Sequence, residues 1–178
     1  MREVSAMDFF EVVKMRQSIR AFQDKPIEPE QLRQILETIN RAPSAGNLQG
    51  YEVYLVTHCD VLQALARSTN GQDFITQAPL ALVFCAHPAR SAQKYGQRGT
   101  TLYCVQDATI ACAYAQLAVT ALGLASVWVG AFSEDAVRSA IGVGPDLRPV
   151  AFLPIGYAAE TPERRSRRTL AELVHRVE

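Results

Sequence analysis

The segment 102–122 constrains the fold of this chain more than any other part of the sequence. As a helix it would be about 30 Å long, and Asp107 is its only charged residue. Apolar or small side chains would lie on almost every face, and a helix that is apolar all round must be buried all round. Two arrangements are open: the helix lies at the centre of its own domain, or two copies of the chain share it. Its small residues allow close approach of a second backbone, which favours a dimer.

The same segment is a poor candidate for a membrane span. Crossing the hydrocarbon core takes about 20 predominantly apolar residues, and polar groups interrupt this stretch at Gln106, Asp107, Thr109, Gln116 and Thr120. The first residues, 1–5, run into charged, amphipathic sequence and predict no secretory signal. We therefore expect a cytoplasmic protein without a membrane partner.

Composition narrows the function classes. The 178 residues suffice for one domain spanning 1–178, with 48% hydrophobic residues and 18 basic against 18 acidic side chains. This neutral balance gives no support for a nucleic-acid partner. The four cysteines, Cys59, Cys85, Cys104 and Cys112, show no C-x-x-C spacing. We expect no histidine partners near them, since His58, His87 and His175 are scattered. We expect buried thiols and no metal site.

Hydrophobic periodicity predicts alternating helices and strands. Helices are expected at 8–15, 29–42, 60–67 and 134–141, and strands at 52–57, 80–86, 126–129 and 150–157. The pattern is typical of a layered α/β or α+β domain. The segment 90–101 reads as an exposed connection or as a mobile flap over a pocket, where Tyr95 or Tyr103 could stack on a flat substrate.

Arginines gather near both ends of the chain. One cluster is Arg16-Gln17-Ser18-Ile19-Arg20, and the other occupies 164–168. The first could simply complement the dipole at a helix end. Guanidinium groups also bind phosphate in a bidentate manner. Because the sequence has neither a G-x-G-x-x-G motif nor a P-loop, any phosphate site must be built from side chains, and we expect the two clusters to converge on the phosphate of a small cofactor.

Two further segments could contact a planar ligand. Residues 42–49 form a polar turn after a helix, which is either a plain connection or a ligand loop. Gly130 follows a predicted strand, where close backbone approach and free amides are possible. The sequence offers no nucleophile elbow and no catalytic carboxylate pair, so no side chain is expected to be catalytic. If the chain is an enzyme, a cofactor supplies the chemistry.

The chain resembles the nitroreductase family of FMN-dependent flavoproteins. The resemblance covers about the whole chain and rests on these segments, in the family's order: Arg16-Gln17-Ser18-Ile19-Arg20-Ala21-Phe22, Ala42-Pro43-Ser44-Ala45-Gly46-Asn47-Leu48-Gln49, Gln106-Asp107-Ala108, Leu122-Gly123-Leu124-Ala125-Ser126-Val127-Trp128-Val129-Gly130, and Pro154-Ile155-Gly156-Tyr157 before an arginine tail.

The resemblance implies an α+β fold: a three-layer α-β-α sandwich with a central mixed, largely antiparallel sheet, dimerising through the long apolar helix. It places FMN at the interface of a homodimer. The implied cofactor-binding residues are Arg16, Gln17, Ser18, Arg20, Pro43, Ser44, Asn47, Gln72, Val129, Gly130, Arg165 and Arg167. Arg16, Arg165 and Arg167 would hold the phosphate.

Other roles follow from the same resemblance. Ser18 and Arg20 would face the ribityl chain and the pyrimidine edge of the ring, and the partner subunit would contribute the loop that holds Ser44. Val129 and Gly130 would place backbone groups near flavin N5. Gln17 stands where a second arginine or a histidine is common in the family.

The implied function is an FMN-dependent NAD(P)H oxidoreductase with a ping-pong mechanism. Hydride would pass from NADH or NADPH through flavin N5 to a nitroaromatic, a quinone or an activated alkene. Alternatives are a specialised family reaction such as reductive dehalogenation, and a flavin-binding carrier or redox sensor with little turnover.

Overall fold

The computed structural model describes residues 8–177, so the expectation for the first five residues lies outside the described part. Its sheet has four strands: β1 (Tyr51–Val56), β2 (Leu80–Ala86), β3 (Ala125–Ser126) and β4 (Arg148–Gly156), in the order β1-β2-β4-β3. Each pair of neighbouring strands is antiparallel. A parallel bridge between Ser18 and Ser126 adds to this sheet. The largely antiparallel sheet is therefore confirmed.

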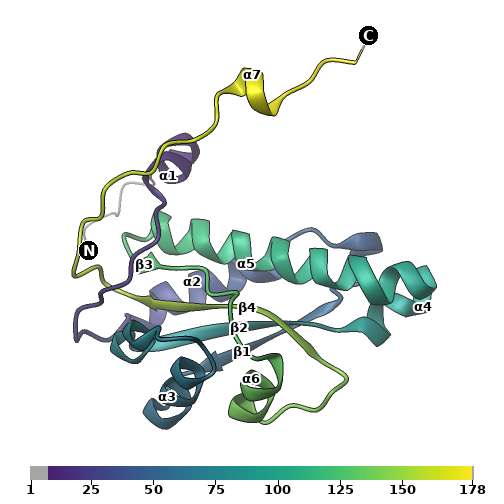
Figure 1. Ribbon diagram of the computed structural model, residues 1–178, viewed down its shortest axis with the longest axis horizontal. Helices are drawn as coiled ribbons and strands as arrows, with labels where there is room; N and C mark the ends of the chain where they lie inside the picture. Colours follow the sequence, from purple (N-terminus) through teal and green to yellow (C-terminus); the bar gives the residue numbers. More distant parts are fainter. Residues whose placement is uncertain (1–7, 178) are drawn as a thin grey trace.

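Helices cover both faces of the sheet (Figure 1). Helices α2 (Pro29–Asn40) and α5 (Cys104–Ala121) lie on one face, and α3 (Cys59–Arg67) and α6 (Glu134–Ile141) on the other. Side chains of β2 alternate between the two sides, as a pleated strand requires. Leu82 and Phe84 pack with α2 and α5, and Val83 packs with α3 and α6. All of β2 is buried, as the continuous apolar run predicts.

Three local sequence signals explain where helices begin and end. Asp8 caps α1 (Phe9–Met15) by accepting a hydrogen bond from the Phe10 amide at 3.0 Å. Pro29 starts α2 at a position where a missing N–H costs nothing. Gly142 ends α6 with φ of 70°, the left-handed conformation that glycine adopts readily. These helices agree with the sequence prediction within two residues.

The prediction for 90–101 was wrong about conformation. This segment forms most of α4 (Pro88–Arg98) and part of a π-helical turn, η3 (Gly99–Tyr103), that leads into α5. Pro88 at the first helical position and several good helix formers after it favour the helix. Gly99 also packs closely on the backbone of Ser91, where a Cβ atom would overlap a carbonyl. Two glycines and an aromatic ring were therefore misread as signs of a loop.

The predicted strand at 126–129 is only partly regular. Regular pairing covers Ala125 and Ser126, and Val129 joins the sheet through an isolated antiparallel bridge to Phe152. Short helical turns, η1 (Ala45–Asn47) and η2 (Asp73–Gln77), and a four-residue helix, α7 (Leu170–Leu173), complete the described chain.

Helix α5 is not enclosed by its own chain. Ala108, Ala111, Cys112 and Ala115 are fully buried against the sheet. On the opposite side, Gln106, Thr109, Ala113 and Tyr114 are exposed to solvent. Burial at the centre of the monomer therefore does not account for the whole surface of this helix. No described helix meets the length and apolarity needed to cross a membrane.

Candidate functional site

Backbone pairing brings the two ends of the chain together. The Ile19 amide donates to the Ser126 carbonyl at 3.1 Å, and the Gln23 amide donates to Tyr157 at 2.9 Å. The Ala159 amide in turn donates to Ala21 at 2.9 Å. The backbone at 18–23 therefore lies beside both β3 and the segment that follows β4. This pairing directs residues 8–17 and 161–177 to the same side of the molecule, as Figure 1 shows.

Both arginine clusters line one cavity of about 610 Å³, which we call the arginine cavity. Its volume falls in the range of about 300–1,000 Å³ usual for small-molecule sites. Its lining residues are Val13, Lys14, Arg16, Gln17, Ser18, Arg20, Pro162, Glu163, Arg164, Arg165 and Arg167. Six of the twelve cofactor residues implied by the sequence thus share a single cavity.

The electrostatic character of the arginine cavity is cationic. Five arginines and a lysine face one carboxylate, that of Glu163. Among residues 8–177, none of these five arginines forms an ion pair within 4.0 Å. Arg167 instead donates from Nη1 to the carbonyls of Arg165 and Ser166, at 3.1 and 3.2 Å. The buried Gln17 Oε1 atom also has no hydrogen-bond partner in the described structure.

This donor set fits a phosphate-bearing cofactor. Guanidinium groups bind phosphate oxygens through charge-assisted hydrogen bonds, and the Ser18 hydroxyl and Gln17 amide can serve neutral polar groups beside them. A planar ring system needs apolar surface as well. Val13, Pro162 and the aliphatic parts of the long side chains supply apolar surface in the cavity. The cavity therefore offers both charged and apolar contacts, although no aromatic side chain among residues 8–177 lines it.

The loop 44–50 lies elsewhere, against α5, and has an ordered conformation. The buried Asp107 carboxylate accepts hydrogen bonds from the Ala45 amide at 2.9 Å and from the Gly50 amide at 3.2 Å. The Ser44 hydroxyl accepts from the Gln49 amide at 2.9 Å. Pro43 and Asn47 are exposed at the surface of this region. The segment is therefore more than a plain turn, but it does not line the arginine cavity.

The two predicted substrate-binding tyrosines contact each other beside this loop. The rings of Tyr95 and Tyr103 form an edge-to-face pair with centroids 4.9 Å apart, a favourable aromatic geometry. Tyr103 and Ala45 help to line a second cavity of about 420 Å³, together with Gln106, Asp107, Thr109 and Ile110. The structure thus brings both tyrosines to the 44–50 loop and not to the arginine cavity.

The remaining predicted residues also lie outside the arginine cavity. The Val129 amide donates to the Phe152 carbonyl at 3.0 Å, and the Phe152 amide donates back at the same distance. The backbone donor of Val129 is therefore already used, whereas Gly130 is exposed. Gln72 immediately precedes η2, and its backbone amide donates a hydrogen bond to Thr69 Oγ1 at 3.3 Å.

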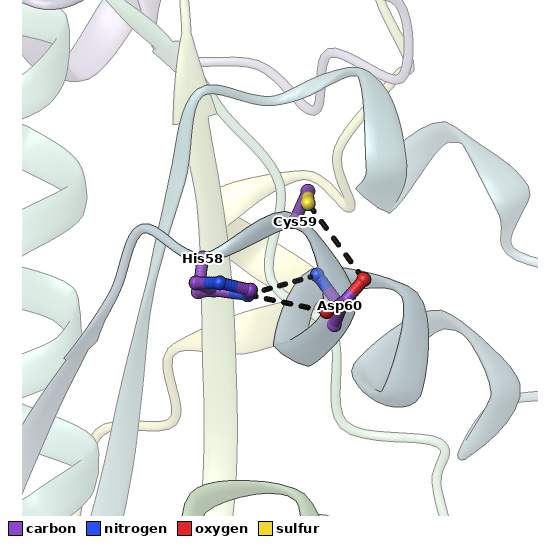
Figure 2. Close-up of side chains that lie close together, drawn as sticks. All are labelled: His58, Cys59 and Asp60. Carbon is purple, nitrogen blue, oxygen red and sulfur yellow. Dashed lines mark hydrogen bonds and ion pairs between the residues drawn. The ribbon is translucent and has the colours of Figure 1, made fainter.

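The expectation that no histidine lies near a cysteine was wrong. His58, Cys59 and Asp60 are consecutive, and their side-chain ligand atoms lie within 4.8 Å of one another (Figure 2). All three residues are exposed. His58 Nδ1 accepts a hydrogen bond from the Asp60 amide at 3.3 Å and so caps α3. The geometry is that of a helix cap. The expectation that this protein has no metal site stays a prediction.

The other three cysteines are buried, as expected. Burial raises the pKa of Cys85 to about 12 and also raises the pKa of Cys104 and Cys112. Thiols in such surroundings stay protonated at neutral pH and are poor nucleophiles.

Sequence reasoning missed the roles of Asp107 and Arg90. The sequence marked Asp107 as the single charge of a long helix and as part of the family-like segment 106–108, without a role, and Arg90 as part of an exposed connection or flap. Arg90 Nη1 donates to the Gln49 carbonyl at 3.1 Å, and its Nη2 lies 2.9 Å from Glu52 Oε1. The isolated charge in an apolar helix was the available signal, because a buried carboxylate needs hydrogen-bond partners.

Comparison with known proteins identifies the family. The model of the nitroreductase family matches residues 13–72 and 61–157. The chain belongs to the nitroreductase family. This finding confirms the resemblance seen in the sequence.

The chain is also similar to named bacterial proteins. A Thermus thermophilus protein named NADH dehydrogenase is 31% identical over 172 residues, covering 82% of this chain and 84% of the relative. A Bacillus subtilis protein named FMN reductase [NAD(P)H] is 30% identical over 174 residues, covering 88% and 70% respectively.

A solved nitroreductase family structure from Clostridium difficile has the same fold. It superposes with a TM-score of 0.84 at 31% identity, covering 95% of this chain and 98% of the other. The fold of the chain, helices around an antiparallel sheet, is therefore that of the nitroreductase family.

Proposed function

We propose that this chain is an FMN-dependent oxidoreductase that takes hydride from NADH or NADPH and delivers it to a flat electron acceptor. The observation that carries the proposal is the convergence of Arg16 and Arg20 with Arg165 and Arg167 in one cavity. The Bacillus subtilis relative named FMN reductase supports the choice of cofactor and reductant. FMN would supply the redox chemistry when bound, while the protein would bind the cofactor, orient the substrates and exclude water.

The arginine cavity would hold the polar end of FMN. Arg16, Arg165 and Arg167 would bind the phosphate, and Ser18, Gln17 and Arg20 would contact the ribityl chain and the pyrimidine edge of the ring. Arg20 is exposed in one chain, so its charge is available to a neighbouring group. A guanidinium in that position would stabilise the negative charge that a reduced ring carries.

The proposal requires two copies of the chain, arranged as three-layer α-β-α sandwiches that pair through α5. Apolar side chains support this arrangement, because single chains leave several of them in water. The exposed fractions of Phe10, Leu170 and Val174 are 77%, 76% and 61%. Solvent also reaches the outer side of α5 at Ala113 and Tyr114. A partner would cover these groups and bring Pro43, Ser44 and Asn47 to the ring.

The remaining groups would complete the catalytic surface. The Val129 amide already donates to Phe152. The exposed Gly130 amide would therefore donate the hydrogen bond that the reactive edge of the flavin ring accepts. Gln72 would contribute from the loop before η2. Tyr95 and Tyr103 would stack on the flat acceptor, which would be a nitroaromatic, a quinone or an activated alkene. The whole range 1–178 acts as one domain in this proposal.

Reconstitution with FMN tests the function directly. The purified protein should take up FMN in a 1:1 ratio per chain, with the visible absorbance of bound flavin. Under anaerobic conditions, NADH or NADPH should reduce the flavin and bleach that absorbance. Adding menadione or a nitroaromatic should reoxidise the flavin and restore the absorbance. If the protein takes up FMN but NADH and NADPH do not bleach it, the reductase function is rejected and a flavin carrier or redox sensor is the remaining interpretation. Sedimentation should give the mass of two chains, and a monomer that binds FMN fully would contradict the shared site.

A further inference from the structure

Three residues of the loop 44–50 have positive φ, and for one of them, Gln49, this conformation is rare. Gly46, Asn47 and Gln49 have φ of 58°, 57° and 50°. Glycine adopts this left-handed region at no cost, and asparagine tolerates it, but glutamine rarely enters it. Such residues persist only where the surrounding structure holds them. The loop therefore needs contacts from outside itself to keep this shape.

Asp107 supplies those contacts from the first turn of α5. One carboxylate oxygen accepts the Ala45 amide at 2.9 Å and the other accepts the Gly50 amide at 3.2 Å, so the two oxygens join the two ends of the loop. The residue is only 2% exposed. Hydrogen bonds to a charged acceptor are stronger than neutral ones, and burial increases their strength. The position of Asp107 on a packed helix makes the attachment rigid.

Neighbouring groups close the loop from the side of α4. Arg90 holds the Gln49 carbonyl at 3.1 Å, and Glu52 Oε1 receives both Arg90 at 2.9 Å and His87 Nδ1 at 3.1 Å. Gly50 fits tightly, because a Cβ atom there would overlap Ser91 Oγ and lie 3.0 Å from Asp107 Oδ2. A side chain at position 50 therefore does not fit between the loop and helices α4 and α5.

We infer that Asp107 is a positioning residue that fixes the 44–50 loop in its ligand-binding shape before any cofactor arrives. Both of its oxygens are occupied by backbone amides of the loop, so it acts through the loop and not on reacting atoms. The bound ends hold Ser44 and Asn47 in place at the surface. The flavin part of this inference rests on the proposed function, in which that surface completes the site of the partner subunit.

Asp107→Asn and Asp107→Ala test the inference without relying on enzyme activity. In apo protein, hydrogen–deuterium exchange should show protected amides at Ala45 and Gly50 in the wild type. Asparagine can accept only one of the two amides, so protection should fall at one end of the loop, and alanine should remove it at both. FMN affinity should fall about tenfold for asparagine, the factor expected from one lost charge-assisted hydrogen bond.

Gln116→Ala is the matched control, since Gln116 is also a buried polar residue of α5 but is not the acceptor for either loop amide, a role that Asp107 fills. Gln116→Ala should leave both loop exchange and FMN affinity unchanged even if it lowers the melting temperature. Equal loop exchange in wild type and Asp107→Ala would overturn the inference. So would equal FMN affinity in these two proteins.

Gly50→Ala provides a second route if the Asp107 variants do not fold. It retains every charge and disturbs the loop only by the added methyl group. It should weaken FMN binding, and adding Ser91→Ala should recover part of the loss by removing the overlapping hydroxyl. Unchanged binding in Gly50→Ala would count against a fixed loop. Wild-type protein that binds no FMN would reject the proposed function and the flavin part of the inference, while the exchange data would still decide whether Asp107 holds the loop.

Discussion

The two arginine clusters of the same cavity differ in how firmly the chain holds them. Residues 16–20 enter a backbone segment that is hydrogen-bonded to Ser126 and Tyr157, and Arg16 is half-buried. Residues 164–168 lie in an exposed tail, where the hydrogen bonds of Arg167 within residues 8–177 go to the neighbouring carbonyls of Arg165 and Ser166. The first cluster is therefore prepared for an anion. The second must be ordered by the ligand, which reduces its net contribution to binding.

The largest effect should come from Arg16→Ala. A held guanidinium loses little entropy on binding, so its removal costs the full charge-assisted contact. We expect FMN affinity to fall roughly 10- to 150-fold, equivalent to about 1.5–3 kcal/mol. Titration by quenching of flavin fluorescence measures this change. A loss smaller than that of Arg167→Ala would reverse the comparison between the clusters.

Arg167→Ala should have a smaller effect of about threefold to tenfold, because part of its contact energy is spent in ordering the tail. The same titration applies, with proteolysis of the tail as a second measurement. Bound FMN should protect the tail of the wild type from trypsin more than the tail of Arg167→Ala. Equal protection would show that Arg167 does not order the tail on the ligand.

Salt should separate the clusters further. Exposed charges are screened at high ionic strength, whereas partly buried ones are screened less. We expect the FMN affinity of Arg16→Ala, which depends on the tail, to fall more steeply between 0.05 and about 0.5 M NaCl than that of Arg167→Ala. Parallel salt dependence in the two variants would indicate that both arginines experience the same environment in the complex.

The smallest effect should come from Arg33→Ala, a control arginine outside the cavity. Arg33 is paired with Glu30 and Glu37 on the surface of α2, and its hydrogen bonds lower the pKa of Glu30 to about 2. The substitution should raise that pKa toward its ordinary value, as NMR titration can measure. FMN affinity should not change, because Arg33 is engaged by two carboxylates and does not line the arginine cavity. A drop in FMN affinity would mean that the loss of any positive charge weakens FMN binding, whether or not the arginine lies in the cavity.

Elements with strong local patterns could be predicted from the sequence. The apolar run 80–86 became β2 exactly where continuous burial was expected, and Pro29 and Gly142 mark helix boundaries by local chemistry. The conformation of α4 was missed because Gly96 and Gly99 suggested a loop, whereas Gly96 is a kink and Gly99 a close packing contact. Local propensity does not report such tertiary contacts.

In the candidate site, too, some features could be predicted from the sequence and others depend on tertiary contacts. The convergence of Arg16 with Arg165 was expected from the resemblance, and the structure brings both to one cavity. The role of Asp107 could not be derived from spacing, because its partners Ala45 and Gly50 lie about sixty positions away and contribute only backbone amides. Every residue carries such an amide, so no side-chain pattern marks it.

The pairing of the segment at 18–23 with the backbone after β4 has a consequence for biosynthesis. One wall of the arginine cavity, at 13–20, is translated about 140 residues before the other wall, at 162–167. The cavity is therefore incomplete until the segment after β4 has paired with the backbone at 18–23. An anion that needs both walls can bind only after this pairing has formed.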